Sequence, residues 1–144
     1  GAAAVEADVP PPPPPFQPSE QVGAVAPLGF FDPLGFAKAG DEAGFRKLRA
    51  AELKHGRVAM MASVGLLGQH WLRFPGFDAA PSGLGALNSA EGVAGSVLML
   101  LPVTAIMELA WREDASREPG NFGDPFGVKM YNDEMRNKEI SNGR

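Results

Sequence analysis

Two long stretches of the chain carry almost no charge, and both have the character of helices. The first begins at Asp41, and its uncharged part covers residues 58–72. The second carries no charge between residues 92 and 107. Helix breakers are rare in both stretches, so we expect helix one over about residues 42–73 and helix two over about residues 90–112.

The second stretch is long enough to cross a membrane. About 20 apolar residues span a bilayer core of ~30 Å, and Glu108 is the only charge between residue 92 and Arg112. Pro102 removes one backbone donor there, which membrane helices tolerate better than soluble ones. The uncharged part of the first stretch is shorter, and hydropathy alone predicts a core helix there.

The positions of lysine and arginine favour two membrane spans. They fall into groups of six, one and six along the chain: 38, 46, 47, 49, 54 and 57; then 73; then 112, 117, 129, 136, 138 and 144. Because basic residues accumulate on the cytoplasm-like side of a membrane, we predict two spans whose outer ends share that side. The loop over residues 75–90 would face the other side.

Composition changes this picture at the amino end. The mean hydropathy of the whole chain is only -0.09, and 14 residues are proline, six of them consecutive at positions 10–15. A proline run of this kind favours polyproline II. We therefore expect residues 1–30 to be an extended arm, as a spacer rather than a ligand for a proline-recognising domain, and residues 31–144 to form the folded domain.

Charge and cysteine content exclude several classes of function. With no cysteine, the chain has no disulfide framework, thiolate metal site or cysteine nucleophile. A net charge of -4 gives no electrostatic reason to expect nucleic acid. The sequence lacks an initiator methionine and its first basic residue is Lys38, so we expect that a targeting peptide was removed or lies outside this sequence.

A motif occurs twice. An Asp-Pro-x-Gly turn at residues 32–35 precedes Glu-Leu-Lys-His-Gly-Arg at 52–57, and the same turn at 124–127 precedes Glu-Ile-Ser-Asn-Gly-Arg at 139–144. Duplication with an altered loop explains this better than chance. The second copy ends where the first enters its apolar run, so we expect residues 131–144 to be the start of a third, truncated helix.

The charges of the two copies predict a crossed pair of helices. On helix one, Glu52 and His55 share a face, whereas Glu52 and Arg57 are roughly 140° apart. An unpaired charge inside a membrane costs at least ~2.5 kcal/mol. We therefore predict that Glu52 pairs with Arg144 and Glu139 with Arg57 in a pseudo-twofold crossing.

The same crossing offers ligands for a metal. Gly56 and Gly143 would let the two backbones approach, while spare carboxylate oxygens, His55 and Asn142 would present single nitrogen or oxygen atoms. Such ligands suit a metal whose other positions are already filled, for example the magnesium of a tetrapyrrole. A protein zinc site needs three or four convergent ligands, which two histidines and no cysteine hardly supply.

These residues resemble a known family. Residues 52–60 look like the first-helix chlorophyll-binding signature of light-harvesting complex proteins, the chlorophyll a/b-binding superfamily, and residues 139–144 look like its third-helix copy. The closest similarity is to red-lineage antennae with chlorophyll a, chlorophyll c and fucoxanthin or peridinin. The resemblance runs from about residue 30 to 144. It implies an all-α, integral membrane three-helix fold in which helices one and three form the crossed pair.

The resemblance also implies roles for individual residues. Five would be magnesium ligands: Glu52, His55, Glu108, Glu139 and Asn142. Two arginines would be charge partners of the ligating glutamates: Arg57 and Arg144. The turns would hold carotenoid end groups: Asp32, Pro33, Asp124 and Pro125. Gln69 and His70 are further candidate ligands, with membrane-interface side chains as the alternative. Green-plant relatives place a glutamine ligand eight residues before the helix-two glutamate, where this chain has Leu100.

The predicted function is that of a light-harvesting antenna subunit, not an enzyme. It would bind chlorophyll a, chlorophyll c and carotenoids of the fucoxanthin, peridinin or diadinoxanthin type, and pass excitation energy to photosystem I or II. Its partners would be photosystem core subunits, neighbouring antenna proteins and thylakoid lipids. The expected location is the plastid thylakoid membrane, with the amino terminus on the stromal side.

Three alternatives differ in what they require. A photoprotective relative needs acidic lumenal residues, and the 75–90 loop offers only Asp78, which favours harvesting. A pigment-free scaffold or assembly factor would be colourless. A soluble helical metal enzyme would stay in solution without detergent, and it leaves the repeated Glu and Arg residues unexplained.

Overall fold

The computed structural model describes residues 11–73, 75–76, 78–124 and 127–144, so the first ten residues of the predicted arm lie outside the described part. Within it the chain is all-helical, as predicted, with α-helices α1 (Glu42–Gly68), α2 (Ala90–Ala110) and α3 (Asp133–Gly143). Two short 3-10 helices, η1 (Pro18–Glu20) and η2 (Gly83–Asn88), precede α1 and α2. The described residues contain no strand, and a single isolated bridge joins Val25 to Gly29.

A polar side chain begins each α-helix. The three N-caps accept hydrogen bonds from backbone N–H groups three residues on: Asp41 from Gly44 at 2.9 Å, Ser89 from Gly92 at 3.1 Å and Asn132 from Met135 at 2.8 Å. Such oxygens satisfy donors that have no partner within the helix. Local sequence therefore determines where all three helices start.

The ends of the helices differ from the prediction. α1 ends at Gly68 instead of continuing to about residue 73. The N–H of Trp71 bonds the carbonyl of Gly68, three residues back, at 3.0 Å, which is a tighter turn than the α-helix, and glycine favours this change because it is a poor helix former. Smaller differences occur where Trp111 ends α2 and Asn132 precedes α3.

The predicted extended arm is too long. From Phe16 onward the chain packs on the helices, with the Phe16 ring centroid 5.2 Å from that of Phe45. The Gly23 N–H donates to Asn137 of α3 at 2.7 Å, and the Gly23 carbonyl accepts from Arg144 at 3.0 Å. The prediction rested on the proline content of residues 1–30 as a whole. The proline run itself stops at residue 15, and the contacts begin after it.

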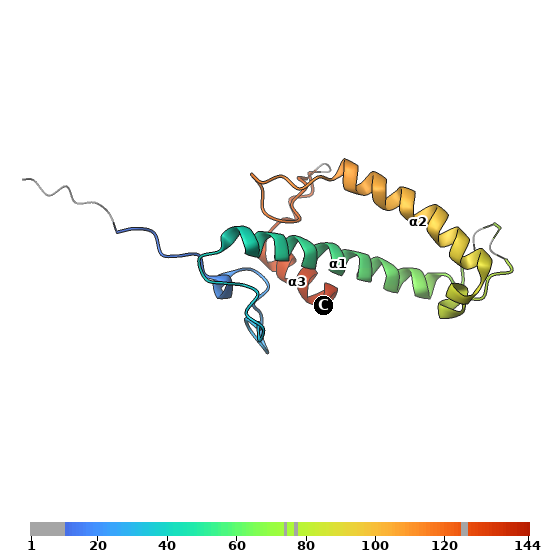
Figure 1. Ribbon diagram of the computed structural model, residues 1–144, viewed down its shortest axis with the longest axis horizontal. Helices are drawn as coiled ribbons and strands as arrows, with labels where there is room; N and C mark the ends of the chain where they lie inside the picture. Colours follow the sequence, from blue (N-terminus) through green and yellow to red (C-terminus); the bar gives the residue numbers. More distant parts are fainter. Residues whose placement is uncertain (1–10, 74, 77, 125–126) are drawn as a thin grey trace, which may run out of the picture.

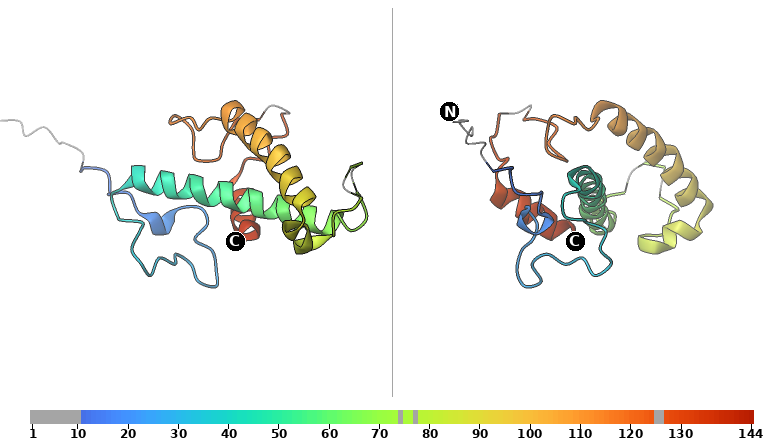
Figure 2. Two further views of the ribbon diagram at one scale, coloured as in Figure 1. Left: turned by 45° about the vertical axis from the view of Figure 1, so that its right-hand side comes forward. Right: turned by 60° about the vertical axis from the view of Figure 1, so that its left-hand side comes forward.

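The helix α1 lies at the centre of the molecule (Figure 1). The short helix α3 crosses its first half, and α2 returns antiparallel along α1. The right-hand view of Figure 2 looks nearly along α1 and shows α3 on one side of it and α2 on the other. Among the described residues the buried large side chains are Leu53, 8% exposed, and Ile140, 5% exposed, and both lie at the crossing of α1 and α3.

The helix α2 has little protein cover. Its apolar side chains are exposed, as Leu98 at 78% illustrates. In the described part of the chain, Gly92–Ala110 is the one helical stretch long and apolar enough to cross a membrane, and none of it is buried in the protein.

Candidate functional site

Two glycines bring α1 and α3 into backbone contact. A Cβ atom added to Gly56 would lie 3.1 Å from the Cα of Gly143, and one added to Gly143 would lie 2.9 Å from the Cα of Gly56. Backbone atoms cannot move aside as a flexible side chain can. The observed crossing therefore requires a residue without Cβ on both helices.

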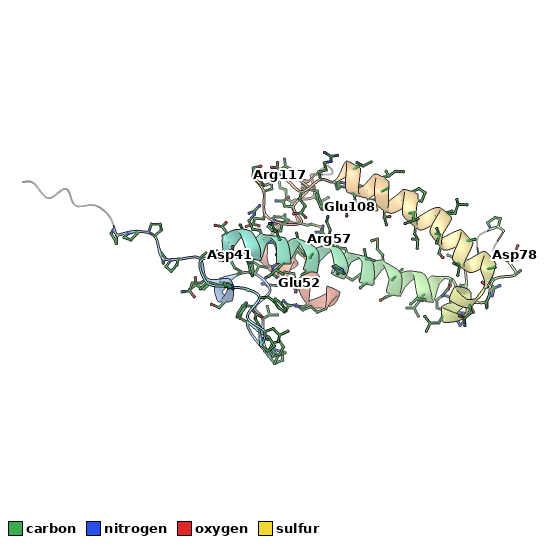
Figure 3. The ribbon with its side chains drawn as sticks, in the orientation of Figure 1. Asp41, Glu52, Arg57, Asp78, Glu108 and Arg117 are labelled. Carbon is green, nitrogen blue, oxygen red and sulfur yellow. The ribbon has the colours of Figure 1, made fainter. Side chains whose placement is uncertain are left out.

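Arg57 of α1 reaches across this crossing. Its Nε donates to Oε1 of Glu139 at 2.5 Å, and its Nη2 donates to the carbonyl of Gly120 at 3.1 Å. The guanidinium carbon also lies 5.6 Å from the ring centroid of Phe122. Arg57 thus ties α1 to α3 and to the loop that follows α2; Figure 3 labels its place on α1.

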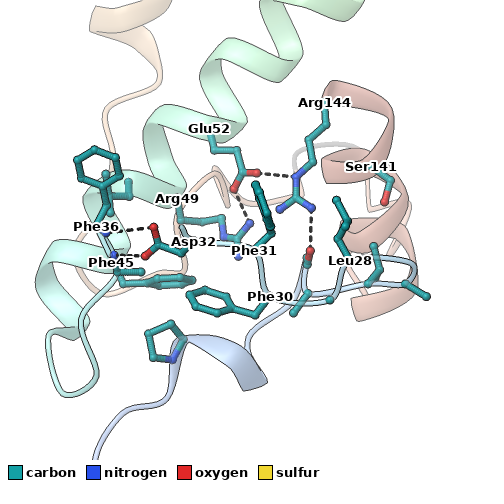
Figure 4. A pocket seen from close by; sticks show the side chains of 18 of the residues that line it. Leu28, Phe30, Phe31, Asp32, Phe36, Phe45, Arg49, Glu52, Ser141 and Arg144 are labelled. Carbon is teal, nitrogen blue, oxygen red and sulfur yellow. Dashed lines mark hydrogen bonds and ion pairs between the residues drawn. The ribbon is translucent and has the colours of Figure 1, made fainter. Parts of the chain in front are cut away.

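Glu52 of α1 lies between two arginines (Figure 4). Nε of Arg144 donates to its Oε1 at 2.8 Å, and Nη1 of Arg49 donates to its Oε2 at 2.6 Å. The sequence pointed to Arg144 but missed Arg49. The spacing of three residues between Arg49 and Glu52, which places both on one helix face, is the signal that could have revealed it.

Both glutamates at the crossing keep atoms that could bind a metal. In Glu52 each carboxylate oxygen accepts one hydrogen bond, and an oxygen of this type has two lone pairs. In Glu139 Arg57 donates to Oε1, and no described residue donates to Oε2. Pairing with arginine therefore neutralises these carboxylates without using up their capacity to coordinate.

His55 and Asn142 lie beside the crossing with exposed side chains. The Nδ1 of His55 is 2.7 Å from the carbonyl oxygen of Ala51, and a hydrogen bond there requires Nδ1 to carry the proton. The lone pair then belongs to Nε2, which is the arrangement common to metal-ligating histidines. Both side chains are exposed, so each could coordinate a metal ion that approaches from outside the protein.

Glu108 of α2 forms an ion pair with α1. Nζ of Lys54 lies 2.9 Å from its Oε2, and the two side chains are 41% and 63% exposed. Lys54 was not among the predicted site residues. Sequence periodicity carries no signal for this contact, because the two residues belong to different helices.

The two Asp-Pro turns have the same hydrogen-bond pattern. Each carboxylate accepts two N–H groups, four and five residues on: Asp32 from Phe36 at 3.1 Å and Ala37 at 2.7 Å, and Asp124 from Val128 at 3.0 Å and Lys129 at 2.6 Å. Gly35 and Gly127 adopt φ of +69° and +65°, a left-handed conformation that glycine adopts freely. The Ala37 N–H above all lowers the pKa of Asp32. Pro125 lies outside the described residues.

Each turn lines a cavity. The Asp32 turn and neighbouring phenylalanines, together with Glu52 and Arg144, surround a cavity of about 550 Å³ (Figure 4). The Asp124 turn borders one of about 380 Å³, which Phe122 and Glu139 also line. Both cavities combine apolar walls with charged groups from the crossing.

Gln69 and His70 lie apart from these residues, at the opposite end of α1. Gln69 is half-buried and follows the last residue of the helix. His70 is exposed, and its ring lies edge-on to Trp71 with centroids 6.4 Å apart. The structure therefore does not bring either residue to the crossing.

Tyr131, the only tyrosine in the sequence, fastens the loop between α2 and α3. Its hydroxyl donates to Oε2 of Glu118 at 2.9 Å, and Nη1 of Arg136 lies 2.9 Å from the same oxygen. Burial, and then the hydrogen bond to Glu118, raise the pKa of Tyr131 to about 12.

We expect an alkaline titration to report this contact. The folded pKa of Tyr131 lies above its ordinary value of 10.0, so the contact stabilises the fold below that pH, and its contribution is lost as the pH rises towards about 12. Ultraviolet difference absorption of the phenolate measures the midpoint, and the variant Glu118→Gln should bring it closer to the ordinary value. An ordinary midpoint in the unmodified protein would contradict the contact.

The chain is similar in sequence to known proteins. The chain is 36% identical over 141 residues to fucoxanthin-chlorophyll a-c binding protein A, chloroplastic, of Macrocystis pyrifera, covering 86% of this chain but only 65% of the relative, just under two thirds. It is 37% identical over 144 residues to protein F of the same designation from Phaeodactylum tricornutum, covering 86% of this chain and 71% of the relative. Residues 17–144 match the family described as chlorophyll A-B binding protein. This match confirms the family resemblance inferred from the repeated motif, and the chain belongs to the chlorophyll a-b binding protein family.

Proposed function

We propose that this chain is the pigment-binding part of a light-harvesting antenna protein that passes excitation energy to a photosystem. The observation that carries the proposal is the pair of reciprocal Glu–Arg contacts at the crossing of α1 and α3. They place neutralised carboxylates, with coordination capacity to spare, on α1 and α3, and most apolar side chains of α1 are exposed. Family membership supports the same conclusion.

The donor atoms fit the magnesium of chlorophyll. That ion would take one oxygen or nitrogen atom from the protein, because the tetrapyrrole would fill its other positions. In our proposal Glu52, Glu139, His55, Asn142 and Glu108 provide these atoms. Among the described residues no group of three or more acidic, histidine or cysteine side chains could hold a metal ion together.

The relatives guide the choice of pigments. Their names specify fucoxanthin and chlorophylls a and c, and we assign chlorophyll a, chlorophyll c and a fucoxanthin-type carotenoid to this chain. The two Asp-Pro turns are our candidates for carotenoid end groups. Support comes from the polar turn and apolar walls of each cavity, which suit a polar end group on an apolar polyene.

The pigments supply the chemistry of light absorption and excitation transfer when they are bound. The residues of this chain hold each pigment at a set distance and orientation, and their apolar surroundings exclude water. Arg57 and Arg144 keep the carboxylates charged and oriented. We assign no bond-making step to the chain, and we therefore propose a binding function and not an enzyme.

We propose a thylakoid location with the amino terminus on the stromal side. The exposed apolar surface of α2 favours contact with lipid and pigment, since burial of apolar surface gains about 25 cal/mol per Å². We assign α1 as a membrane span in addition to α2. Basic residues gather near the start of α1 and after the end of α2, which places these two helix ends on the same side of the membrane. Photosystem core subunits and neighbouring antenna proteins are the partners that follow from this location.

The absorption spectrum of the purified protein tests the proposal. The protein that carries this chain, extracted in detergent from its native membrane, should bind chlorophyll a, chlorophyll c and a carotenoid in a fixed ratio. Circular dichroism in the visible range should show exciton coupling between them. A colourless preparation with intact helices would overturn the antenna function and favour a scaffold.

Replacing His55 with leucine should remove about one chlorophyll per chain and leave the fold intact. The imidazole is exposed and, within the described part of the chain, bonds to its own helix backbone alone, so its loss removes a ligand and little packing. Pigment extraction with quantification per protein measures the loss, and far-ultraviolet circular dichroism checks the helices. Unchanged pigment stoichiometry would contradict the role of His55 as a ligand.

A further inference from the structure

Lys54 occupies a position that the doubled motif does not explain. It lies two residues after Glu52 and so points roughly 200° away around the helix. Glu52 faces α3, whereas the Lys54 ammonium lies 2.9 Å from Glu108 of α2. The equivalent residue in the second copy of the motif is Ser141. The lysine is therefore present in the copy of the motif on α1, which pairs with α2, and is absent from the copy on α3.

Glu108 needs a cation at this point. It is the only charged residue of α2 from Gly92 to Ala110, and it lies near the end of α2, opposite the first half of α1 (Figure 3). A carboxylate in such a helix requires a partner when lipid or pigment covers it. Arg57, the nearest arginine along α1, is engaged with Glu139 and Gly120. Lys54 fills this role in the structure.

We propose that Lys54 is a positioning residue for Glu108: it neutralises the carboxylate through Oε2 and directs Oε1 to the magnesium of a bound chlorophyll. This inference rests on the proposed function, because it assumes that Glu108 ligates a pigment. At the crossing, arginines neutralise the carboxylates of Glu52 and Glu139. In our proposal a lysine of α1 neutralises the carboxylate of α2 in the same way. One cation thereby links helix docking to pigment binding.

Four variants of the full protein separate this role from simple helix docking. Lys54→Met should lose about one chlorophyll per chain, and Glu108→Ala should lose the same one. Lys54→Arg should keep it, because the charge remains. The control Lys47→Met removes an exposed lysine of the same helix and should change nothing.

The decisive variant combines two changes. A glutamine at position 108 offers an amide oxygen without a charge and needs no cation, so Glu108→Gln should keep the chlorophyll. The double variant Lys54→Met with Glu108→Gln should keep it too. If Lys54 only held the helices together, the double variant would lose the pigment as the single Lys54→Met variant does.

Two measurements report the outcome: the number of chlorophylls per chain after extraction, and the temperature at which the helices melt by circular dichroism. The proposal predicts that Lys54→Met melts earlier than the Lys47→Met control. Full pigment in Lys54→Met or in Glu108→Ala would overturn the proposal. So would loss of the chlorophyll from Glu108→Gln or from the double variant.

Failure of this inference differs from failure of the proposed function. If the unmodified protein carries pigment but Lys54→Met loses none, the antenna function stands and only the role of Lys54 is wrong. If the unmodified protein carries no pigment, both are wrong.

Discussion

Replacing Arg57 with methionine should strongly destabilise the crossing of α1 and α3. It removes the cation 2.5 Å from Glu139, the hydrogen bond to Gly120 and the contact with Phe122. The Arg57 and Glu139 side chains are 32% and 30% exposed in the protein alone, and pigment and lipid would cover the remainder. Stranding a covered carboxylate costs about 3 to 5 kcal/mol, so we expect little assembled, pigmented protein.

The yield of pigmented protein and its thermal unfolding measure this effect. Arg117→Met is a matched control, because Arg117 lies 4.0 Å from Asp114 and both side chains are more than half exposed; it should assemble normally. Adding Glu139→Gln to Arg57→Met should recover part of the loss, since the stranded charge is then gone. Normal assembly of Arg57→Met would show that the cross-pairing does not hold the helices.

Replacing Gly56 with leucine should also prevent α1 and α3 from crossing closely. Even the first carbon of a side chain there would meet the backbone of Gly143 at 3.1 Å, and the rest of the leucine would push the helices apart. Overpacking of this kind typically costs about 1 to 3 kcal/mol. We expect the loss to be larger here, because displacement of α3 also separates Arg57 from Glu139. Thermal unfolding and pigment count measure the result.

A glycine on the same helix provides the control. A Cβ at Gly65 would meet nothing within 4 Å, and alanine is a better helix former than glycine by about 1 kcal/mol. Gly65→Ala should therefore leave the stability unchanged or raise it. If Gly56→Leu behaved like Gly65→Ala, the close contact of the two helices would not exist in the assembled protein.

Local sequence was enough to predict the helices and where they begin. Asp41 caps α1 within its own first turn, and such contacts depend on residues only a few positions apart. The carboxyl end of α1 was harder to predict. No proline occurs between residues 34 and 74 to mark the end of α1, and the tighter turn after Gly68 depends on how the following loop folds back.

The site was partly predictable for a different reason. Duplication provided two copies of a Glu–Arg motif whose members cannot pair within one helix, and this implied the partners Arg144 and Arg57. Lys54 carried no such signal, because its charge is equally compatible with a solvated helix surface until the position of α2 is known. Arg49 was missed although its spacing of three residues from Glu52 indicates the pair.

The packing of the amino-terminal segment could not be predicted from composition. Gly23 contacts Asn137 and Arg144 through its backbone N–H and carbonyl. Such groups do not depend on the side chain, so hydropathy and composition do not indicate where they will form contacts. Proline content suggested an extended spacer over the whole segment. The contacts begin only after the proline run ends.

By itself the sequence determined an all-helical chain, the starts of its helices, the repeated turns and the family to which it belongs, because these depend on short-range patterns and on motif identity. Only the tertiary structure decided which cation faces each carboxylate and which glycines touch. Ion pairs and backbone contacts act over a few ångströms, and the relative placement of three helices joined by irregular loops sets those distances. The crossing of α1 and α3 and the lysine between α1 and α2 are therefore properties of the fold.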